Sequence, residues 1–218
     1  MKKIINITAL LMAVAILTTS FANSNDGSVY GSSNHEKTIQ NMVAAITGET
    51  DARAKYIAFS IRATEEGFFN IAKLFLASAE GEVIHARNHN LVLQDLGLRT
   101  YHPTPSIPVV LTTMENLLAA IEGETYEFQV MYPGFIADAQ SEGSDNAVES
   151  FMWALGAEIK HARFLTKALE ILKTTGSDET LPSTWYVCPK CGDLFDSIEG
   201  IAVSQMFCRV DPSTFLKF

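Results

Sequence analysis

Cysteine is scarce in this chain and confined to its end. The 218 residues include three cysteines, all of them after residue 187. An exported protein that relies on disulfides normally carries an even number of cysteines. The odd, closely spaced set therefore argues against a disulfide framework and indicates thiolates that hold a metal.

Positive charge is also in short supply. The chain has 16 Lys and Arg against 25 Asp and Glu, a formal net charge of -9, and it contains no basic run. Binding to phosphate-rich surfaces depends on clustered Lys and Arg side chains. The charge balance therefore argues against nucleic acid and anionic membrane surfaces as partners, and we expect no nucleic acid to bind.

Long apolar runs are missing except near the start, where residues 9–17 form one uninterrupted run behind two lysines. Small residues follow at the positions that a signal peptidase reads, Ser20 and Ala22, and the run is too short for a comfortable membrane span. We expect residues 1–22 to be a signal peptide and residues 23–35 a linker, which places the mature protein in the periplasm. The alternative of an uncleaved anchor stays open.

The next part of the chain is predicted to form four helices. Apolar positions recur at helical spacing, and Gly67, Gly97 and Gly143 stand where helices would end. Three prolines between residues 98 and 110 exclude a regular helix there and predict a long extended crossover. The expected helices cover about residues 34–66, 69–96, 109–142 and 145–173.

The two helix pairs are an internal repeat. AITGET begins at Ala45 and AIEGET at Ala120, and the tripeptide HAR begins at His85 and again at His161. The offset between the copies is 75 at the hexapeptide and 76 at the tripeptide, so the second copy has gained one residue between them. Two helical hairpins joined by one long crossover predict a mainly α, ferritin-like four-helix bundle.

Each expected helix carries one glutamate on its apolar stripe. Four ionised carboxylates inside a bundle would be costly, because burial and mutual repulsion both disfavour the charged form, and bound cations would remove both penalties. On two helices a histidine follows the glutamate by three residues, on the same face. This pattern is typical of carboxylate-bridged di-iron or di-manganese centres. The candidate ligands are Glu49, Glu82, His85, Glu124, Glu158 and His161, with Glu127 as an additional carboxylate.

A single Glu-x-x-His match most often belongs to a solvated helix face, but two matches in register within a repeat favour ligation. Tyr56 and Tyr132 follow Glu49 and Glu124 by seven and eight residues, so we expect them to hydrogen-bond the ligands, with a plain core position as the alternative. The remaining histidines, His35, His89 and His102, have no partner at ligand spacing and are assigned no role.

A small module is expected at residues 185–218, after a linker at residues 175–184. It contains Cys-x-x-Cys-Gly flanked by aromatics, a third cysteine, and an aspartate where a fourth thiolate would stand. Thiolates at this spacing bind iron or zinc. The candidate ligands are Cys188, Cys191, Cys208 and Asp211. A disulfide between Cys188 and Cys191 is the alternative, and it would leave Cys208 unpaired.

From about residue 36 to residue 218 the chain resembles a rubrerythrin. The resemblance rests on GETDARAKY and EVIH in the first half, GETYEFQVMYPGF and EIKH in the second, and CPKCG near the end. It implies a ferritin-like di-iron domain at residues 36–174 and a rubredoxin-like β module at residues 185–218. It also implies two irons in the bundle, with all seven of the family's ligands matched, and one iron or zinc in the module.

The resemblance further implies a reaction, the two-electron reduction of hydrogen peroxide to water in defence against oxidative stress. In the family, electrons enter through the rubredoxin iron, and dimers set one chain's rubredoxin beside the partner's di-iron centre, so a homodimer is expected. One iron of the family site exchanges a histidine for a carboxylate on oxidation, which corresponds to His85 and Glu127. Tyr56 and Tyr132 match tyrosines that hydrogen-bond that site.

Two departures from the family pattern keep alternatives open. Asp211 replaces the fourth thiolate, and the predicted signal peptide puts the protein where the electron-donor protein is unknown. The oxidant is hydrogen peroxide or oxygen. The alternative function is a non-enzymatic iron-binding or sensing protein whose terminal module is structural, and a third is ferroxidase activity or iron storage.

Overall fold

The computed structural model describes residues 34–201 and 210–218. The predicted signal peptide, most of the linker at residues 23–35, and Cys208 lie outside the described residues. None of the helices in the described ranges combines the length and the hydropathy needed to cross a bilayer.

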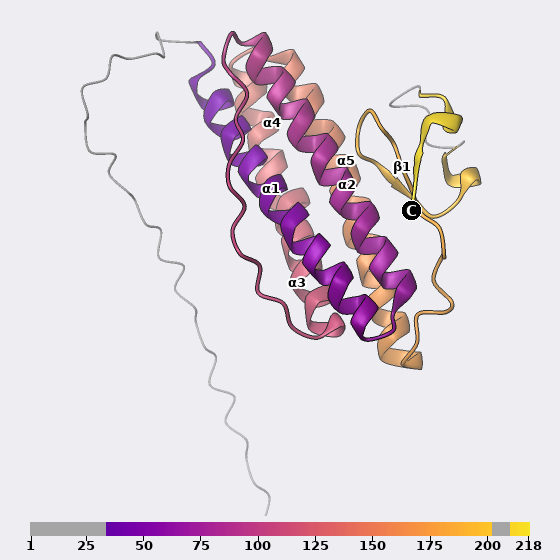
Figure 1. Ribbon diagram of the computed structural model, residues 1–218. Coiled ribbons are helices and arrows are strands. Elements are labelled where there is room, and N and C mark those ends of the chain that lie inside the picture. Colours follow the sequence, from indigo (N-terminus) through magenta and orange to yellow (C-terminus); the bar gives the residue numbers. More distant parts are fainter. Residues whose placement is uncertain (1–33, 202–209) are drawn as a thin grey trace, which may run out of the picture. The chain divides into compact units, whose positions relative to one another are not determined.

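Long antiparallel helices make up most of the described chain (Figure 1). The predicted mainly α bundle is confirmed, and each hairpin of the repeat supplies two of its four rods. The helices are α1 (Glu36–Glu65), α2 (Phe69–Asp95), α3 (Thr113–Tyr126), α4 (Tyr132–Ser141) and α5 (Asp145–Thr175).

The crossover between α2 and α3 carries no helix or strand and runs beside α1 in Figure 1. The prediction that the third helix starts at Val109 is wrong, because α3 begins at Thr113. Thr112 and Glu115 form a capping box there, in which each side chain accepts from the other residue's backbone N–H. This cap satisfies donors that a helix start leaves unpaired, and so it fixes where α3 begins.

The predicted third helix also contains a π-helical turn, η1 (Glu127–Met131), between α3 and α4. The repeat offset is 75 at Glu49 and Glu124 but 76 at Tyr56 and Tyr132. The residue gained by the second copy is therefore accommodated as one wide turn, which keeps α3 and α4 in line. Such turns inside α-helices are frequent at functional sites.

The interior consists of two apolar clusters, one at each side of the buried glutamates. Tyr56, Phe59 and Phe75 belong to the first cluster, and Tyr132 and Phe151 belong to the second. Their aromatic rings are buried and pack stacked, edge-on or tilted against one another. The carboxylates thus lie inside a dry core.

The terminal module is a three-stranded antiparallel sheet in the order β2-β1-β3. Its strands are β1 (Tyr186–Val187), β2 (Leu194–Phe195) and β3 (Leu216–Lys217), with the 3-10 turn η2 (Pro212–Thr214) before β3. Trp185 is completely buried, and its ring packs edge-on against Phe164 of α5 at a centroid distance of 5.0 Å. The module therefore shares a core with the bundle.

The linker that joins bundle and module is packed rather than free. Asp178 is buried, and its carboxylate accepts from the backbone N–H groups of Asn70 and Ile71 at 2.6 and 3.0 Å, in the first turn of α2. Leu181 is also buried in the first apolar cluster. These contacts tie residues 177–181 to the start of α2.

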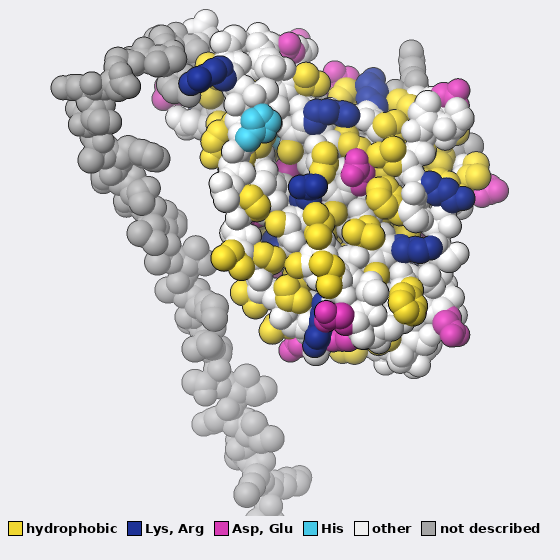
Figure 2. Space-filling view, viewed as in Figure 1, with side chains coloured by type: hydrophobic (Ala, Val, Ile, Leu, Met, Phe, Trp, Pro, Cys, Tyr) yellow, Lys and Arg dark blue, Asp and Glu magenta, His cyan; other side chains and the backbone are white. Residues whose placement is uncertain are grey.

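The Cys-x-x-Cys loop, residues 188–192, lies on its own chain's α2 and α5. Asn88 donates to the carbonyl of Lys190 at 2.8 Å, and Lys160 of α5 is paired with Asp193 at 2.5 Å. Within one chain the loop thus contacts its own bundle, and the placement beside a partner's bundle stays a prediction. The face seen in Figure 2 exposes many apolar side chains, and in the crossover Ile107 is 95% and Val109 76% exposed.

Candidate metal centre

Four buried carboxylates from four rods of the bundle meet in its middle. Each glutamate is at most 1% exposed, although an isolated ionised carboxylate is almost never found at such depth. The glutamates are Glu49 of α1, Glu82 of α2, Glu124 of α3 and Glu158 of α5. His85 and His161 stand one turn after Glu82 and Glu158 and are equally buried.

These six side chains form two overlapping groups whose ligand atoms lie within 4.8 Å of one another. The first group contains Glu49, Glu82, His85 and Glu158, and the second contains Glu82, Glu124, Glu158 and His161. Glu82 and Glu158 belong to both groups. The arrangement therefore has two centres that share two carboxylates.

The carboxylate oxygens divide between the two histidines. His85 Nδ1 lies 3.1 Å from Glu82 Oε2 and 2.9 Å from Glu158 Oε1. His161 Nδ1 lies 3.4 Å from Glu82 Oε1 and 2.8 Å from Glu158 Oε2. Since each shared glutamate turns one oxygen to each side, both are placed to bridge two metal ions.

Several polar atoms of this cluster are buried without a hydrogen-bond partner among the described residues. They lie close to one another without forming hydrogen bonds. Buried polar atoms normally find partners, so an unpaired set that converges on two points fits bound cations. The unpaired atoms include Glu49 Oε2, Glu82 Oε1, Glu124 Oε2, both carboxylate oxygens of Glu158, and His161 Nδ1. Carboxylate and imidazole donors suit iron or manganese.

The pKa shifts of the cluster show that its buried charges are unfavourable without a cation. Burial and the neighbouring Glu82 raise the pKa of Glu158 to about 8, against the pull of His85. Burial also raises the pKa of Glu82 above its ordinary value. Burial alone would lower the pKa of His85, but the charge of Glu158 raises it well above the usual range. These raised pKa values mean that, without metal, Glu158, Glu82 and His85 tend to hold their protons.

Both predicted tyrosines reach across the repeat to a glutamate of the opposite half. The Tyr56 hydroxyl donates to Glu124 Oε1, and the Tyr132 hydroxyl donates to Glu49 Oε1. Burial raises the pKa of both tyrosines, and the same two carboxylates raise it further. Each hydroxyl therefore keeps its proton and holds a ligand carboxylate in place.

Glu127 lies in the π turn and belongs to neither group of four. Its Oε1 is 4.0 Å from the point where a Cβ on Gly48 would stand, one residue before Glu49. Burial raises its pKa well above the ordinary value, and among the carboxylates the charge of Glu49 raises it most. Glu127 is thus beside the Glu49 group without entering it, and its role as a ligand stays a prediction.

His89, to which the sequence assigned no role, is fully buried beside this site. Its Nε2 is 3.8 Å from Glu49 Oε1 and 3.2 Å from the Tyr132 hydroxyl. Burial would raise the pKa of Glu49, but the neighbouring His85 and His89 imidazoles lower it below the usual range. His89 does fall on the apolar stripe of α2, one turn after His85, and that position was the signal available in the sequence.

Two glycines permit close packing behind the histidines. A Cβ on Gly81 would come within 2.9 Å of His161 Cε1, and a Cβ on Gly192 of the terminal module would overlap His85 Nε2. Gly192 also has a φ of +79°, which strains residues with a side chain. The Cys-x-x-Cys loop therefore closes over the outer side of the His85 ring.

The described part of the terminal site differs from a set of free thiolates. Cys188 is free and buried, whereas Cys191 is disulfide-bonded, so the alternative disulfide between these two residues is wrong. Asp211 is exposed, and its carboxylate accepts from the Ser213 backbone N–H at 2.9 Å, which caps η2. Cys208 lies outside the described residues. Metal binding by the module stays a prediction.

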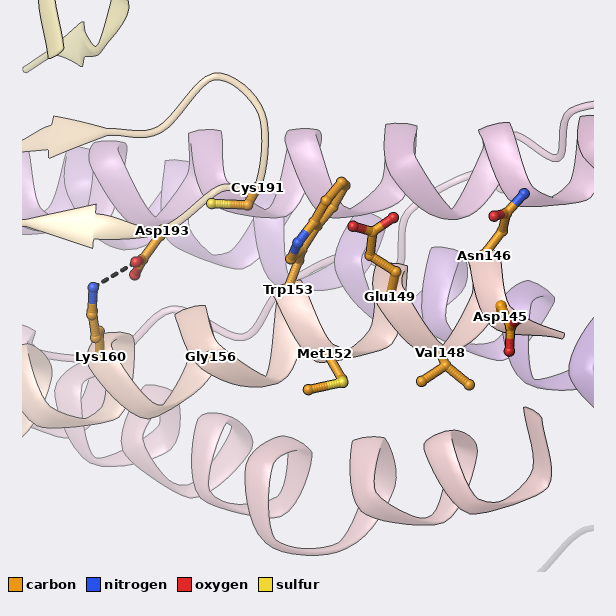
Figure 3. A pocket seen from close by; sticks show the side chains of 10 residues that line it. All are labelled: Asp145, Asn146, Val148, Glu149, Met152, Trp153, Gly156, Lys160, Cys191 and Asp193. Carbon is orange, nitrogen blue, oxygen red and sulfur yellow. Dashed lines mark hydrogen bonds and ion pairs between the residues drawn. The ribbon is translucent and has the colours of Figure 1, made fainter. Parts of the chain in front are cut away.

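A surface pocket of about 710 Å³ lies between α5 and the Cys-x-x-Cys loop (Figure 3). Trp153 and Met152 of α5 line it together with Cys191, and the Lys160–Asp193 ion pair lies at one end. None of the bundle's six buried ligands lines this pocket. The metal centre is therefore enclosed separately inside the bundle.

Comparison with known proteins identifies the family. The sequence profile of the rubrerythrin family matches residues 40–169. Nigerythrin of Nitratidesulfovibrio vulgaris is 37% identical over 155 residues, 71% of this chain and 74% of that protein. A rubrerythrin of Clostridium perfringens is 33% identical over 169 residues, 75% of this chain and 85% of that protein.

The solved structure of nigerythrin in its fully reduced, all-ferrous state has a TM-score of 0.66 and 35% sequence identity. The match covers 80% of this chain and 81% of that one. The profile spans more than half of this chain and includes both Glu-x-x-His pairs. The chain belongs to the rubrerythrin family and carries that family's di-iron type of carboxylate and histidine site.

Proposed function

We propose that this protein reduces hydrogen peroxide to water at an iron pair in the bundle. The observation that carries the proposal is the sharing of Glu82 and Glu158 between two groups, each completed by one histidine and one further glutamate. A bound iron pair supplies the two electrons that the reaction consumes, since one peroxide, two electrons and two protons give two waters.

The chain's own residues supply position, protons and exclusion of solvent. Glu82 and Glu158 hold the two centres at a fixed separation, because each carboxylate faces both histidines. Tyr56 and Tyr132 keep protonated hydroxyls at the ligand carboxylates, close to where peroxide oxygens would need protons. The aromatic clusters on either side keep bulk water out, which strengthens electrostatic interactions within the site.

Anaerobic loading with Fe(II) followed by one equivalent of hydrogen peroxide tests the proposal. We expect rapid loss of ferrous iron, with one peroxide consumed per iron pair, and a slower response to oxygen. Glu124→Ala should lose iron and peroxide consumption together. Glu122→Ala, an exposed carboxylate on the same helix, is the matched control and should keep both.

Two outcomes would contradict this reaction or favour another function. If peroxide leaves the ferrous protein unchanged, the proposed reaction is wrong. If the protein is oxidised once but never turns over with any reduced electron-transfer protein, the alternative of a non-enzymatic iron-binding or sensing protein is favoured.

We also propose that electrons reach the bundle through the terminal module. The closeness of Gly192 to His85 Nε2 supports this route, because it brings the Cys-x-x-Cys loop against a ligand of the first group. The route requires Cys191 as a thiolate, so the reduced protein is the form to test. About three irons per chain with a red thiolate-to-iron absorption would support it. Two irons would mean that a separate donor protein reduces the bundle directly.

Export and self-association complete the proposal. The apolar run behind two lysines supports removal of residues 1–22 and a periplasmic location, and the mass of the protein recovered from a periplasmic extract tests both.

The exposed apolar side chains of Ile107 and Val109 support a homodimer. Sedimentation of the full chain at several concentrations would reveal a monomer if the dimer is wrong.

A further inference from the structure

The two halves of the bundle differ in what stands behind their tyrosines. Behind Tyr132, His89 Nδ1 lies 2.8 Å from the Ser150 hydroxyl, and His89 Nε2 lies 3.2 Å from the Tyr132 hydroxyl. Tyr132 in turn donates to Glu49. A buried chain of hydrogen bonds therefore runs from Ser150 through His89 and Tyr132 to a metal-binding carboxylate.

The equivalent chain is missing behind the other tyrosine. At the repeat offset of 76, Tyr56 corresponds to Tyr132, Leu165 to His89 and Leu74 to Ser150. Leu74 and Leu165 are both completely buried. Tyr56 thus donates to Glu124 with only apolar side chains at the two corresponding positions, and the repeat has a polar network in one copy and leucines in the other.

The geometry fixes how His89 takes part. Because the Tyr132 proton is committed to Glu49, the Tyr132 oxygen can only accept from His89, so Nε2 carries the ring proton. Nδ1 is then left to accept from the Ser150 hydroxyl. His89 and Tyr132 each use one donor and one acceptor in this chain, which holds both side chains in place.

We propose that His89 is a positioning residue that fixes Tyr132, and through it Glu49, so that the metal position of Glu49 and His85 is held more firmly than its counterpart. The inference rests on the bundle binding two metal ions and not on the proposed reaction with peroxide. The position concerned is also the one that Glu127 approaches from the π turn.

Anaerobic Fe(II) titration of the metal-free full chain measures the effect without any oxidant. His89→Leu copies the other half of the repeat and should weaken one of the two Fe(II) binding steps by about 10–100-fold, the usual loss when a partner of a ligand is removed. Tyr132→Phe should weaken the same step. Tyr56→Phe should weaken the other step.

Two amide variants separate positioning from packing. A Gln amide at position 89 can stand where Nε2 stands and donate to Tyr132, so His89→Gln should bind Fe(II) nearly as the wild type does. An Asn amide reaches only the Nδ1 position, so His89→Asn should behave as His89→Leu does. This comparison remains decisive if the leucine variant folds poorly.

A control and a double variant complete the design. Leu93→Ala removes a buried side chain one turn further along α2 and should lower the melting temperature without changing either binding step. His89→Leu combined with Tyr132→Phe should lose no more than Tyr132→Phe alone, because both act through one chain of contacts. The proposal is overturned if His89→Leu changes binding no more than Leu93→Ala, or if the two losses simply add. A protein that binds two Fe(II) as expected but ignores peroxide would contradict only the proposed function.

Discussion

At the scale of single residues, the metal centre is defined by groups that are poorly satisfied without a cation. Glu158 and Glu82 are buried carboxylates with raised pKa values, and their nearest neighbours are one another and two histidines. Such a cluster is tolerated only when protons or metal ions balance the negative charge. The stability of the chain should therefore depend on pH in a way that metal abolishes.

Metal-free protein should become less stable as pH rises from 6.5 to 8. The pKa of Glu158 is raised from 4.5 to about 8, so its contribution is complete below pH 4.5 and is lost as pH approaches 8. His85 and His161 also have pKa values raised above 6.5, so their contributions decline over the same range and beyond it. Glu158 alone should account for about 1–2 kcal/mol of this loss, and the two histidines add to it.

Urea unfolding of chelator-treated protein at several pH values between 6.5 and 8 measures this loss. Glu49, whose pKa is lowered, contributes a constant amount above pH 6.5. His89, whose pKa is also lowered, adds a small gain in stability as its unfolded-state imidazole loses its proton above pH 6.5, and this gain is too small to alter the sign. Protein loaded with Fe(II) under anaerobic conditions should show no such decline, because the metal replaces the protons. Metal-free stability that rises over this interval would contradict the charge balance described for the centre.

At the scale of helices, the repeat also determines how the rods are capped. The Glu142 carboxylate, at the end of α4, accepts from the backbone N–H groups of Lys37 and Thr38 at 3.0 and 2.8 Å. Glu66, at the end of α1, accepts from the N–H of Thr113 at 2.9 Å. Glu66 and Glu142 are separated by the repeat offset of 76, so the same contact is made at both ends of the bundle.

Glu142→Ala should lower the free energy of unfolding by about 0.5–2 kcal/mol, the usual cost of removing a cap from a helix start. Glu66→Ala should cost a similar amount, and the double variant should lose the sum because the caps do not share a partner. Glu170→Ala, an exposed glutamate near the end of α5, is the matched control and should change stability by less than about 0.5 kcal/mol. Equal losses in all three single variants would show that the caps contribute nothing specific.

Periodicity and the repeat predicted the elements well because they are local or symmetric properties. The four rods, the crossover and the six buried ligands follow from apolar spacing and from two copies of one pattern. The π turn was visible only as a gain of one residue, since spacing alone does not say how a helix absorbs it. His89 was missed because its partners, Tyr132 and Ser150, are 43 and 61 residues away, and such contacts exist only after the helices pack.

At the scale of the whole molecule, bundle and module behave as one packed unit over residues 33–218. The sequence suggested a linker between them, but composition could not reveal that Asp178 caps α2 or that Trp185 enters the bundle's apolar cluster. The Cys-x-x-Cys loop is held against α2 through Gly81 and Gly192. The position of the loop beside His85 therefore depends on the same contacts that stabilise the fold.

Trp185→Ala should lower the free energy of unfolding by about 3–5 kcal/mol, because it leaves a large cavity against Phe164. The chain's other tryptophan, Trp153, is half-buried on α5 and packs against the module's smaller apolar cluster, so Trp153→Ala is the comparison variant and should cost less. Urea unfolding followed by circular dichroism reports the helices, and fluorescence of the remaining tryptophan reports its own surroundings. Wild-type protein should give one transition with both probes, since the module and the bundle share a core.

In Trp185→Ala the module should become susceptible to proteolysis at residues 177–184 while the helices stay folded. If Trp185→Ala is as stable and as protease-resistant as Trp153→Ala, the shared core around Trp185 does not hold the module, and the loop beside His85 must be held by its contacts with Trp153, Asn88 and Lys160.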